Sequence, residues 1–239
     1  MLFTPIIKQK KGGNKSSLLP PLPDGSPVIG VFTGISVEVC GAEDIRKIYE
    51  NGFFGKGSKS RGAPKLITTG TIDDTESLSL ELEESAFLAY FLGILCIHDI
   101  QCNEMQYREF LEAAKNVNSH FLECLGSYLY LKSKGWIIKS GIKFGGNFLI
   151  YKRGPRYNHA SFIIFVHTKS DIKDISIKDL KGLQRIAETS DKDVLLLEVS
   201  KPNVLTYNTI SDLAALKISE TIIRRFNSTS FVQSQKITK

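Results

Sequence analysis

The sequence contains few cysteines, and their spacing does not indicate a metal site. The four are Cys40, Cys96, Cys102 and Cys124, and no two of them form a CxxC pair. The spacing therefore gives no signal of a zinc knuckle. Each cysteine lies among apolar neighbours, which predicts buried free thiols and a reducing compartment inside the cell.

Long hydrophobic runs are missing as well. The longest, Ala86–Ile97, has twelve residues and follows several glutamates, so it is too short to cross a bilayer. The segment Met1–Lys15 has neither the apolar length nor the small-residue cleavage site of a signal peptide. From these two features we expect a soluble protein.

The composition is that of an ordinary globular chain. Hydrophobic residues make up 42% and charged residues 23% of the 239 positions, which excludes a collagenous, coiled-coil or fully disordered chain. Lysine and arginine number 31 against 25 aspartates and glutamates, so the formal net charge is +6. This excess permits a polyanionic partner without demonstrating one.

Three regions follow from the distribution of proline, glycine and apolar residues. Residues 1–23 carry four lysines and the run LLPPLP, which predicts a flexible basic arm. Residues 24–118 are expected to form an α+β domain that is mostly helical with some strands. Residues 119–239 are expected to form a second domain of the α/β class, a compact unit with a mixed sheet flanked by helices.

In the first domain, residues 28–40 alternate β-formers with small residues and predict strands. The segment 42–52 predicts a short helix that ends at Gly52. A further helix is expected through the apolar run from Ala86, with Ser77 or Ser79 as its N-cap. Gly52–Gly62, GFFGKGSKSRG, lacks the spacing of a phosphate-binding Walker loop and is interpreted as a flexible surface loop.

The rest of the pattern predicts alternating helices and strands. We expect helices at 109–117, 121–132 and 180–190, with Gly135 ending the second. Strands are expected at both ends of 136–154, in 159–168 and in 193–200. Within the last of these, Leu195–Ser200 is a candidate for packing between subunits, and a buried core strand is the alternative.

Three side chains in the second domain make chemical sense together. Tyr151 ends an apolar strand, His159 follows eight residues later, and Lys192 precedes another apolar strand. In metal-independent RNA cleavage the 2′-hydroxyl loses a proton as it attacks the adjacent phosphate, and the departing 5′-oxygen gains one. Histidine titrates near neutral pH and suits the proton donor. Lysine suits the stabilisation of the extra negative charge on phosphorus.

Tyr151 can serve as the base if nearby cations lower the pKa of its phenol from about 10. The opposite assignment, with His159 as the base, stays open. Since no carboxylate pair or histidine cluster has suitable spacing, we expect neither a metal ligand set nor a cofactor.

The stretch Tyr128–Val166, YLYLKSKGWIIKSGIKFGGNFLIYKRGPRYNHASFIIFV, resembles the catalytic domain of the tRNA-splicing endonuclease family. The resemblance implies a small restriction-nuclease-like sheet, a metal-independent reaction, and a triad of Tyr151, His159 and Lys192. The segment RIAETSDK resembles the family's lysine segment, so Lys192 is preferred over Lys181 or Lys201. Products implied by the family are a 2′,3′-cyclic phosphate and a 5′-hydroxyl.

Three other segments resemble the eukaryotic subunit that cuts the 5′ splice site. They are GFFGKGSKSRG at 52–62, LSLELEESAFLAYFLGIL at 78–95 and KISETIIRRF at 217–226. The resemblance implies precursor tRNA as substrate, a nuclear location (cytoplasmic or on the mitochondrial surface in some lineages), and a heterotetramer. Its other members would be a second catalytic subunit for the 3′ site and two structural subunits. The alternatives are the 3′-site subunit or a non-catalytic RNA-binding subunit.

The resemblance also implies residues that grip RNA. In the family an arginine and an aromatic residue sandwich a bulged base, and Arg185 and Phe226 occupy the matching positions, with Tyr207 as a weaker candidate for the aromatic. The segment 131–156 holds seven basic residues and no acidic one, and we expect it to gather phosphates. They are Lys132, Lys134, Lys139, Lys143, Lys152, Arg153 and Arg156.

Overall fold

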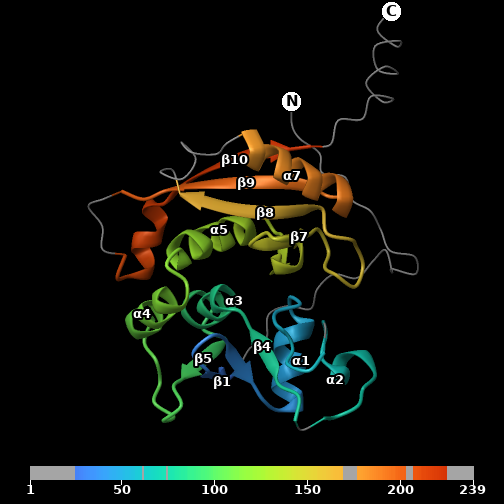
Figure 1. Cartoon of the computed structure of the whole chain (residues 1–239). Helices are drawn as coiled ribbons and strands as arrows, with labels where there is room; N and C mark the ends of the chain where they lie inside the picture. The colour runs from blue at the N-terminus through green and yellow to red at the C-terminus, as the bar shows by residue number, and fades with distance from the viewer. Residues whose placement is uncertain (1–24, 61, 74, 169–176, 203–206, 225–239) are drawn as a thin grey trace, which may run out of the picture.

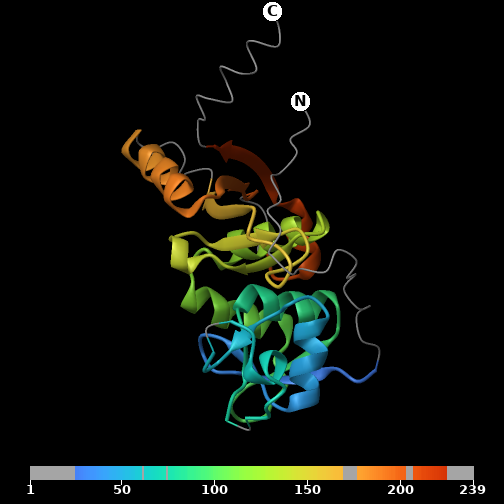
Figure 2. The same cartoon turned by 90° about the vertical axis from the view of Figure 1, so that its right-hand side faces the viewer.

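The computed structural model describes residues 25–60, 62–73, 75–168, 177–202 and 207–224, without the side chains of 177–180. It contains two five-stranded sheets, one in each half of the chain, with helix α5 between them (Figures 1 and 2). The predicted basic arm at 1–23 and Phe226 lie outside the described residues. The class is mixed α/β, as predicted.

The N-terminal half contains more helical than strand residues, as expected, and its strands form one five-stranded sheet. Its strand order is β3-β4-β2-β1-β5, with β1 parallel to β5 and the other neighbours antiparallel. The strands are β1 (Val28–Phe32), β2 (Val37–Val39), β3 (Lys56–Gly57), β4 (Leu78–Leu80) and β5 (Leu95–His98), and the helices beside them are α1 (Ala42–Glu50) and α2 (Lys65–Thr68).

The long helix expected through the apolar run is shorter and begins later. Helix α3 (Leu82–Ala86) is capped by Glu81 and not by Ser77 or Ser79. The Glu81 side chain accepts a hydrogen bond from the Glu84 N–H, and the Glu84 side chain accepts one from the Glu81 N–H. Ser79 lies in β4, where Leu78 and Leu80 both point into the core. The helix continues as the π-helical turn η1 (Phe87–Phe91), and the end of the run forms β5. An apolar run that no polar residue interrupts carries no period that separates helix from strand.

The C-terminal sheet has the order β10-β9-β8-β7-β6. Strands β8 and β9 are parallel, and the other neighbours are antiparallel. The strands are β6 (Ile137–Ser140), β7 (Phe148–Tyr151), β8 (Phe162–Thr168), β9 (Asp193–Ser200) and β10 (Lys217–Ile223). The predicted strands in this half are confirmed. Because β9 lies inside the sheet and its leucines are buried, Leu195–Ser200 is a core strand and not a packing edge for another subunit.

Helices cover both faces of this sheet (Figure 1). Helix α7 (Ile177–Ser190) packs Leu183 and Ala187 against Val194 on one face. Helix α5 (Phe121–Ser133) packs Tyr128 and Leu131 against the other. Short 3₁₀ turns, η2 (Ile142–Phe144) and η3 (Ile210–Ala215), complete the described elements of this half.

Helix α5 is buried on two sides because both halves of the chain pack against it. Phe121, Leu122 and Leu125 belong to the core of the N-terminal half, whereas Cys124, Tyr128 and Leu131 belong to the core of the C-terminal sheet. Helix α4 (Tyr107–Val117) precedes it, and both helices were predicted. The helix ends before Gly135, as expected.

Two local predictions for the N-terminal half were wrong. Cys40 and Cys102 are exposed free thiols, whereas Cys96 is half-buried and Cys124 is buried. The segment 52–62 is not a flexible loop at its start, because Phe53 and Phe54 are core residues and Lys56–Gly57 forms β3. Across the described part of the chain, every helix is too short or too polar to cross a bilayer.

Burial and two neighbouring carboxyl groups raise the pKa of Glu83 in α3 to about 8. An unfolded chain releases this proton near pH 4.5, so the folded state binds more protons between about pH 5 and 8 and loses stability as the pH rises. We therefore expect Glu83→Gln to remove this slope. By thermal unfolding, the variant should match the parent at pH 5 and melt about 10 °C higher at pH 8. Parallel stability curves over this range would contradict the assignment.

Candidate active site

The three predicted reactive residues belong to one edge of the C-terminal sheet. Ile150 of β7 pairs with Phe162 of β8, and Phe162 pairs with Asp193 of β9. Tyr151 is the next residue of β7 beyond this row. Lys192 is also one residue beyond the row, immediately before β9 begins. Two strand spacings of about 4.8 Å each put their backbones roughly 10 Å apart.

Tyr151 and Lys192 are further related by a shared group of side chains on the α7 face of the sheet. Tyr151 and Phe144 both pack against the cluster of Leu149, Ala160 and Ile163. The ammonium of Lys192 lies 4.8 Å from the centre of the Phe144 ring. Phe144 therefore links Lys192 to the cluster against which Tyr151 packs.

His159 lies at the same sheet edge, in the segment that joins β7 to β8. Its side chain is exposed, whereas the following Ala160 is buried in the cluster that also holds Tyr151. The backbone N–H of Ser161 donates to the carbonyl of Ile150 at 2.9 Å. This bond fixes the end of the segment against the end of β7, and His159 stands two residues before it.

Lys192 is held where α7 ends and β9 begins. Asp191 adopts the left-handed conformation (φ 56°), and the Lys192 N–H donates to the carbonyl of Ala187 at 3.3 Å. The Lys192 ammonium donates to the carbonyl of Ser190 at 2.8 Å. The two lysines considered as alternatives lie elsewhere: Lys181 is exposed on α7, and Lys201 follows the far end of β9, where it pairs with Glu123.

The glycines of the segment GIKFGG explain how Phe144 reaches this cluster. A Cβ on Gly141 would lie 2.8 Å from backbone atoms of Gly146 and Phe148. Two stretches of backbone therefore approach each other here more closely than any residue but glycine allows. This close approach forms the turn η2 and folds the Phe144 ring onto Leu149 and Ala160. This part of the sequence signature therefore positions the ring on which Lys192 rests.

Burial raises the pKa of the Tyr151 phenol above its ordinary value. A base requires a shift in the opposite direction. At neutral pH the phenol of the isolated chain is therefore protonated, and it can accept a proton only after losing its own. This direction bears on the choice between Tyr151 and His159 as the base.

Three of the seven cations in the segment 131–156 are engaged by other groups of the protein, which corrects the expectation that all seven gather phosphates. Lys132 packs 4.5 Å from the centre of the Phe54 ring, and burial lowers its pKa to about 8. Lys134 pairs with Glu220 at 2.7 Å. Lys139 donates to backbone carbonyls of the N-terminal half. Exposed positions are held by the other four, Lys143, Lys152, Arg153 and Arg156.

The residues predicted to grip RNA are exposed where the structure describes them. Lys143 is in turn η2, Arg153 follows Tyr151 by two residues, and Arg185 is on the outer side of α7. The proposed aromatic partner Phe226 lies outside the described residues, and the weaker candidate Tyr207 is buried in the core of the N-terminal half.

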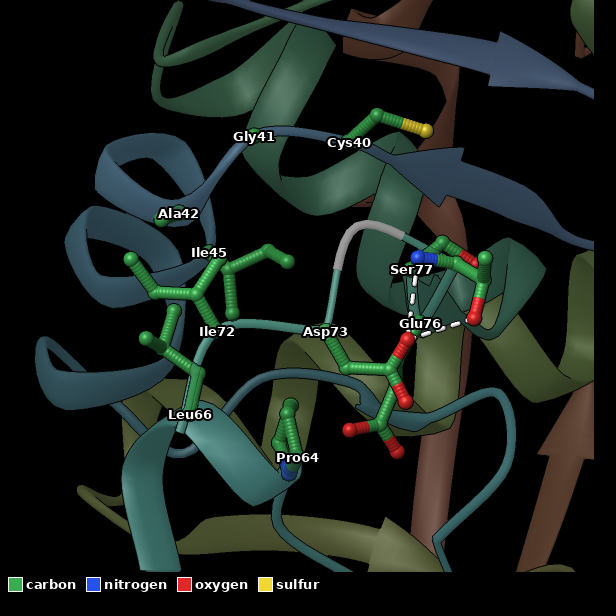
Figure 3. A pocket seen from close by; sticks show the side chains of 11 residues that line it. Cys40, Gly41, Ala42, Ile45, Pro64, Leu66, Ile72, Asp73, Glu76 and Ser77 are labelled. Atoms are coloured by element: carbon green, nitrogen blue, oxygen red, sulfur yellow. Dashed lines mark hydrogen bonds between the residues drawn. The ribbon is translucent and has the colours of Figure 1, made fainter. Parts of the chain in front are cut away.

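One pocket of about 260 Å³ lies in the N-terminal half and not at the sheet edge of the triad (Figure 3). Ile45, Leu66 and Ile72 line its apolar side, and Asp73 and Glu76 its polar side. Glu76 already accepts hydrogen bonds from Ser60 and the Lys65 N–H. Among the described residues, no three His, Cys, Asp or Glu side chains gather as a metal site would require.

Comparison with known proteins identifies the family. The model of the tRNA intron endonuclease catalytic C-terminal domain matches residues 121–207, and that of the family's N-terminal domain matches residues 28–111. A tRNA-splicing endonuclease from Pyrobaculum islandicum is 30% identical over 172 residues, which cover 72% of this chain and 91% of that protein. The chain belongs to the tRNA intron endonuclease family.

Relatives from both eukaryotes and archaea are similar to this chain. The tRNA-splicing endonuclease subunit Sen2 of Mus musculus is 31% identical over 160 residues, covering 63% of this chain and 35% of that protein. A tRNA-splicing endonuclease of Saccharolobus islandicus is 28% identical over 178 residues, covering 73% and 91%. The chain thus matches about a third of the length of the Sen2 protein but nearly all of the archaeal ones.

Sequence reasoning missed the residues that connect the site to the N-terminal half. Phe53 of the N-terminal half contacts both Lys139 and Tyr157 of the C-terminal half. The signals available were the aromatic pair between two glycines at 52–55 and a lysine that interrupts a predicted strand.

Proposed function

We propose that the chain is a catalytic subunit of a tRNA-splicing endonuclease and cleaves precursor tRNA at the 5′ splice site without a metal ion. The observation that carries the proposal is the strand register of the C-terminal sheet, where Tyr151 and Lys192 lie at the same end of two strands separated by β8, and His159 lies in the segment that joins β7 to β8. Membership of the family supports the reaction class.

In the proposed reaction, the 2′-oxygen of the nucleotide before the cut attacks its own 3′-phosphorus. The bond between phosphorus and the 5′-oxygen breaks, which leaves a 2′,3′-cyclic phosphate and a 5′-hydroxyl. His159 gives a proton to the departing 5′-oxygen, and Tyr151, once its own phenol proton has passed to solvent, receives the proton of the 2′-hydroxyl. The Lys192 ammonium stabilises the additional negative charge on the phosphoryl oxygens.

The position of Lys192 supports its role. Its ammonium is held at the start of β9 by the carbonyl of Ser190 and the ring of Phe144, at the same end of the sheet as Tyr151. Lys201, by contrast, pairs with Glu123 at the other end of β9. A cation at this end of the sheet can stabilise the negative charge that develops on a phosphate bound beside Tyr151.

The assignment to the 5′ site is supported by the three segments that resemble the eukaryotic 5′-site subunit. The proposed partners are a 3′-site catalytic subunit and two structural subunits, and the proposed location is the nucleus. Arg185, Lys143 and Arg153 are proposed to hold the RNA, since all three are exposed cations.

We expect His159→Ala, in a complex reconstituted with its partner subunits, to abolish cutting at the 5′ splice site and to leave 3′ cutting unchanged. Loss of a general acid or base costs about 10²–10⁴-fold in rate. The measurement is cleavage of an intron-containing precursor tRNA in excess EDTA, with both junctions followed separately. A matched control is His167→Ala, which changes the same residue type near the far end of β8.

Each other result is equally informative. Loss of 3′ cutting alone would assign the chain to the 3′ site, and unchanged cutting at both sites would make it a non-catalytic subunit. Loss of all activity of the parent complex in EDTA would contradict the metal-free reaction.

A substrate with sulfur in place of the bridging 5′-oxygen decides which residue is the acid. A thiolate leaves without a proton because thiols have a pKa of about 8.5. We expect His159→Ala to cleave this substrate within about tenfold of the parent rate, while Tyr151→Phe stays slower by about 10²-fold or more. Recovery of Tyr151→Phe instead would exchange the two roles, in agreement with the raised pKa of its phenol.

A further inference from the structure

The segment between Tyr151 and His159 rests on the N-terminal half of the chain, at Phe53. Gly154 has φ 108°, and a Cβ added to it would lie 2.4 Å from the Phe53 ring. The Tyr157 ring meets the same ring edge-on, with centroids 6.1 Å apart and planes at 78°. Figures 1 and 2 both show this yellow segment extending from the C-terminal sheet toward α1.

Phe53 is itself held firmly from several directions. It is 6% exposed and has φ 60°, a conformation that is unfavourable for a residue with a Cβ. Its carbonyl accepts a hydrogen bond from the Lys139 ammonium at 2.6 Å. The Tyr49 ring packs edge-on against it at 5.7 Å. The Phe53 ring is therefore a fixed surface against which the segment after Tyr151 packs.

Lys139 ties this surface to the catalytic sheet. It lies on β6, where it pairs with Leu149 of β7, two residues before Tyr151. Its ammonium also lies 3.6 Å from the buried Glu84 carboxylate, whose other oxygen accepts the Gly55 N–H at 3.0 Å. The position of Phe53 is thus set relative to β7 by a charged group with several partners.

The segment is also held at its end, where Ala160 is buried and the Ser161 N–H donates to the carbonyl of Ile150 at 2.9 Å. The N–H groups of Tyr157 and Asn158 both donate to the carbonyl of Gly154, within the segment itself. The packing of Gly154 and Tyr157 on Phe53 therefore relates the middle of this turn to the N-terminal half, while the Ser161 bond relates its end to β7.

We propose that Phe53 is a positioning residue for the active site in the C-terminal half. Its ring limits how closely the segment 152–159 approaches the N-terminal half and thereby determines the position of His159. This inference rests on the proposed function, since it assigns His159 a part in the reaction. A displacement of about 1 Å at a reacting group can cost about 10²-fold in rate. Removing the ring lets Gly154 and Tyr157 move inward and carries His159 with them.

The test compares Phe53→Leu with Phe54→Leu in the reconstituted complex, under single turnover at the 5′ splice site. Phe54 is a matched control because it is adjacent, 3% exposed and packed on Phe87, away from the segment. We expect Phe53→Leu to lower the rate constant at saturating enzyme by about 10–100-fold, with half-saturation changed less than about threefold. Phe54→Leu should keep the rate constant within about threefold while losing comparable thermal stability.

The sulfur-bridged substrate separates positioning of His159 from general damage. If Phe53 acts through the proton donor, the defect of Phe53→Leu should shrink on this substrate, as that of His159→Ala does. The double variant Phe53→Leu/His159→Ala should be no slower than His159→Ala alone on the natural substrate. An undiminished defect on the sulfur substrate, or a further additive loss, would overturn the inference.

The controls keep this inference separate from the proposed function. If His159→Ala leaves both cuts unchanged, the proposed function fails. If His159→Ala abolishes 5′ cutting while Phe53→Leu behaves like Phe54→Leu, the positioning role alone fails. Should Phe53→Leu not fold, Tyr157→Leu removes the same contact from the side of the segment and should show the same loss of rate with unchanged half-saturation.

Discussion

The ammonium of Lys139 is the interaction on which the relation between the two halves depends. It leaves the edge strand β6 and is bound by the carbonyls of Phe53 and Gly55 and by the carboxylate of Glu84. A buried cation is tolerated only where its hydrogen bonds and charge are satisfied, and removing one partner of such a group is costly. The N-terminal half therefore cannot shift relative to β6 without breaking several of these contacts at once, and Phe53 shares that restriction.

This restriction extends to the residues of the proposed active site. Tyr151 packs not only on the C-terminal cluster around Leu149 but also against the core of the N-terminal half. The following segment meets Phe53 before the chain returns to β8. Two of the three proposed catalytic residues are thus bounded by side chains from the first hundred residues. Pre-organisation of this kind is what a reaction without a metal ion needs, since protein groups alone must fix the geometry.

The sequence predicts best where the deciding contact is local. The end of α5 at Gly135 and the strands on both sides of the turn GIKFGG follow from neighbouring residues, and both were predicted correctly. Strand β5 was assigned to a helix because its partner β1 is more than sixty residues away. Phe53 was assigned to a loop for the same reason, since the residues that bury it, Gly154 and Tyr157, follow about a hundred positions later. The triad residues were named from a motif, and their roles depend on a substrate that the chain alone does not contain.

Charge along the sequence was a poor guide to charge on the surface. The basic segment 131–156 looked uniform, yet Lys132, Lys134 and Lys139 are engaged by rings, a carboxylate and carbonyls of the protein itself. The exposed cations that remain lie in turn η2 and in the segment after Tyr151. Turn η2 packs through its residue Phe144, and the segment packs on Phe53. A phosphate attracted to these cations is therefore presented to elements whose positions are already fixed by aromatic packing. Lys139 contributes to the same end indirectly, because it binds the carbonyl of Phe53, on which the segment after Tyr151 packs.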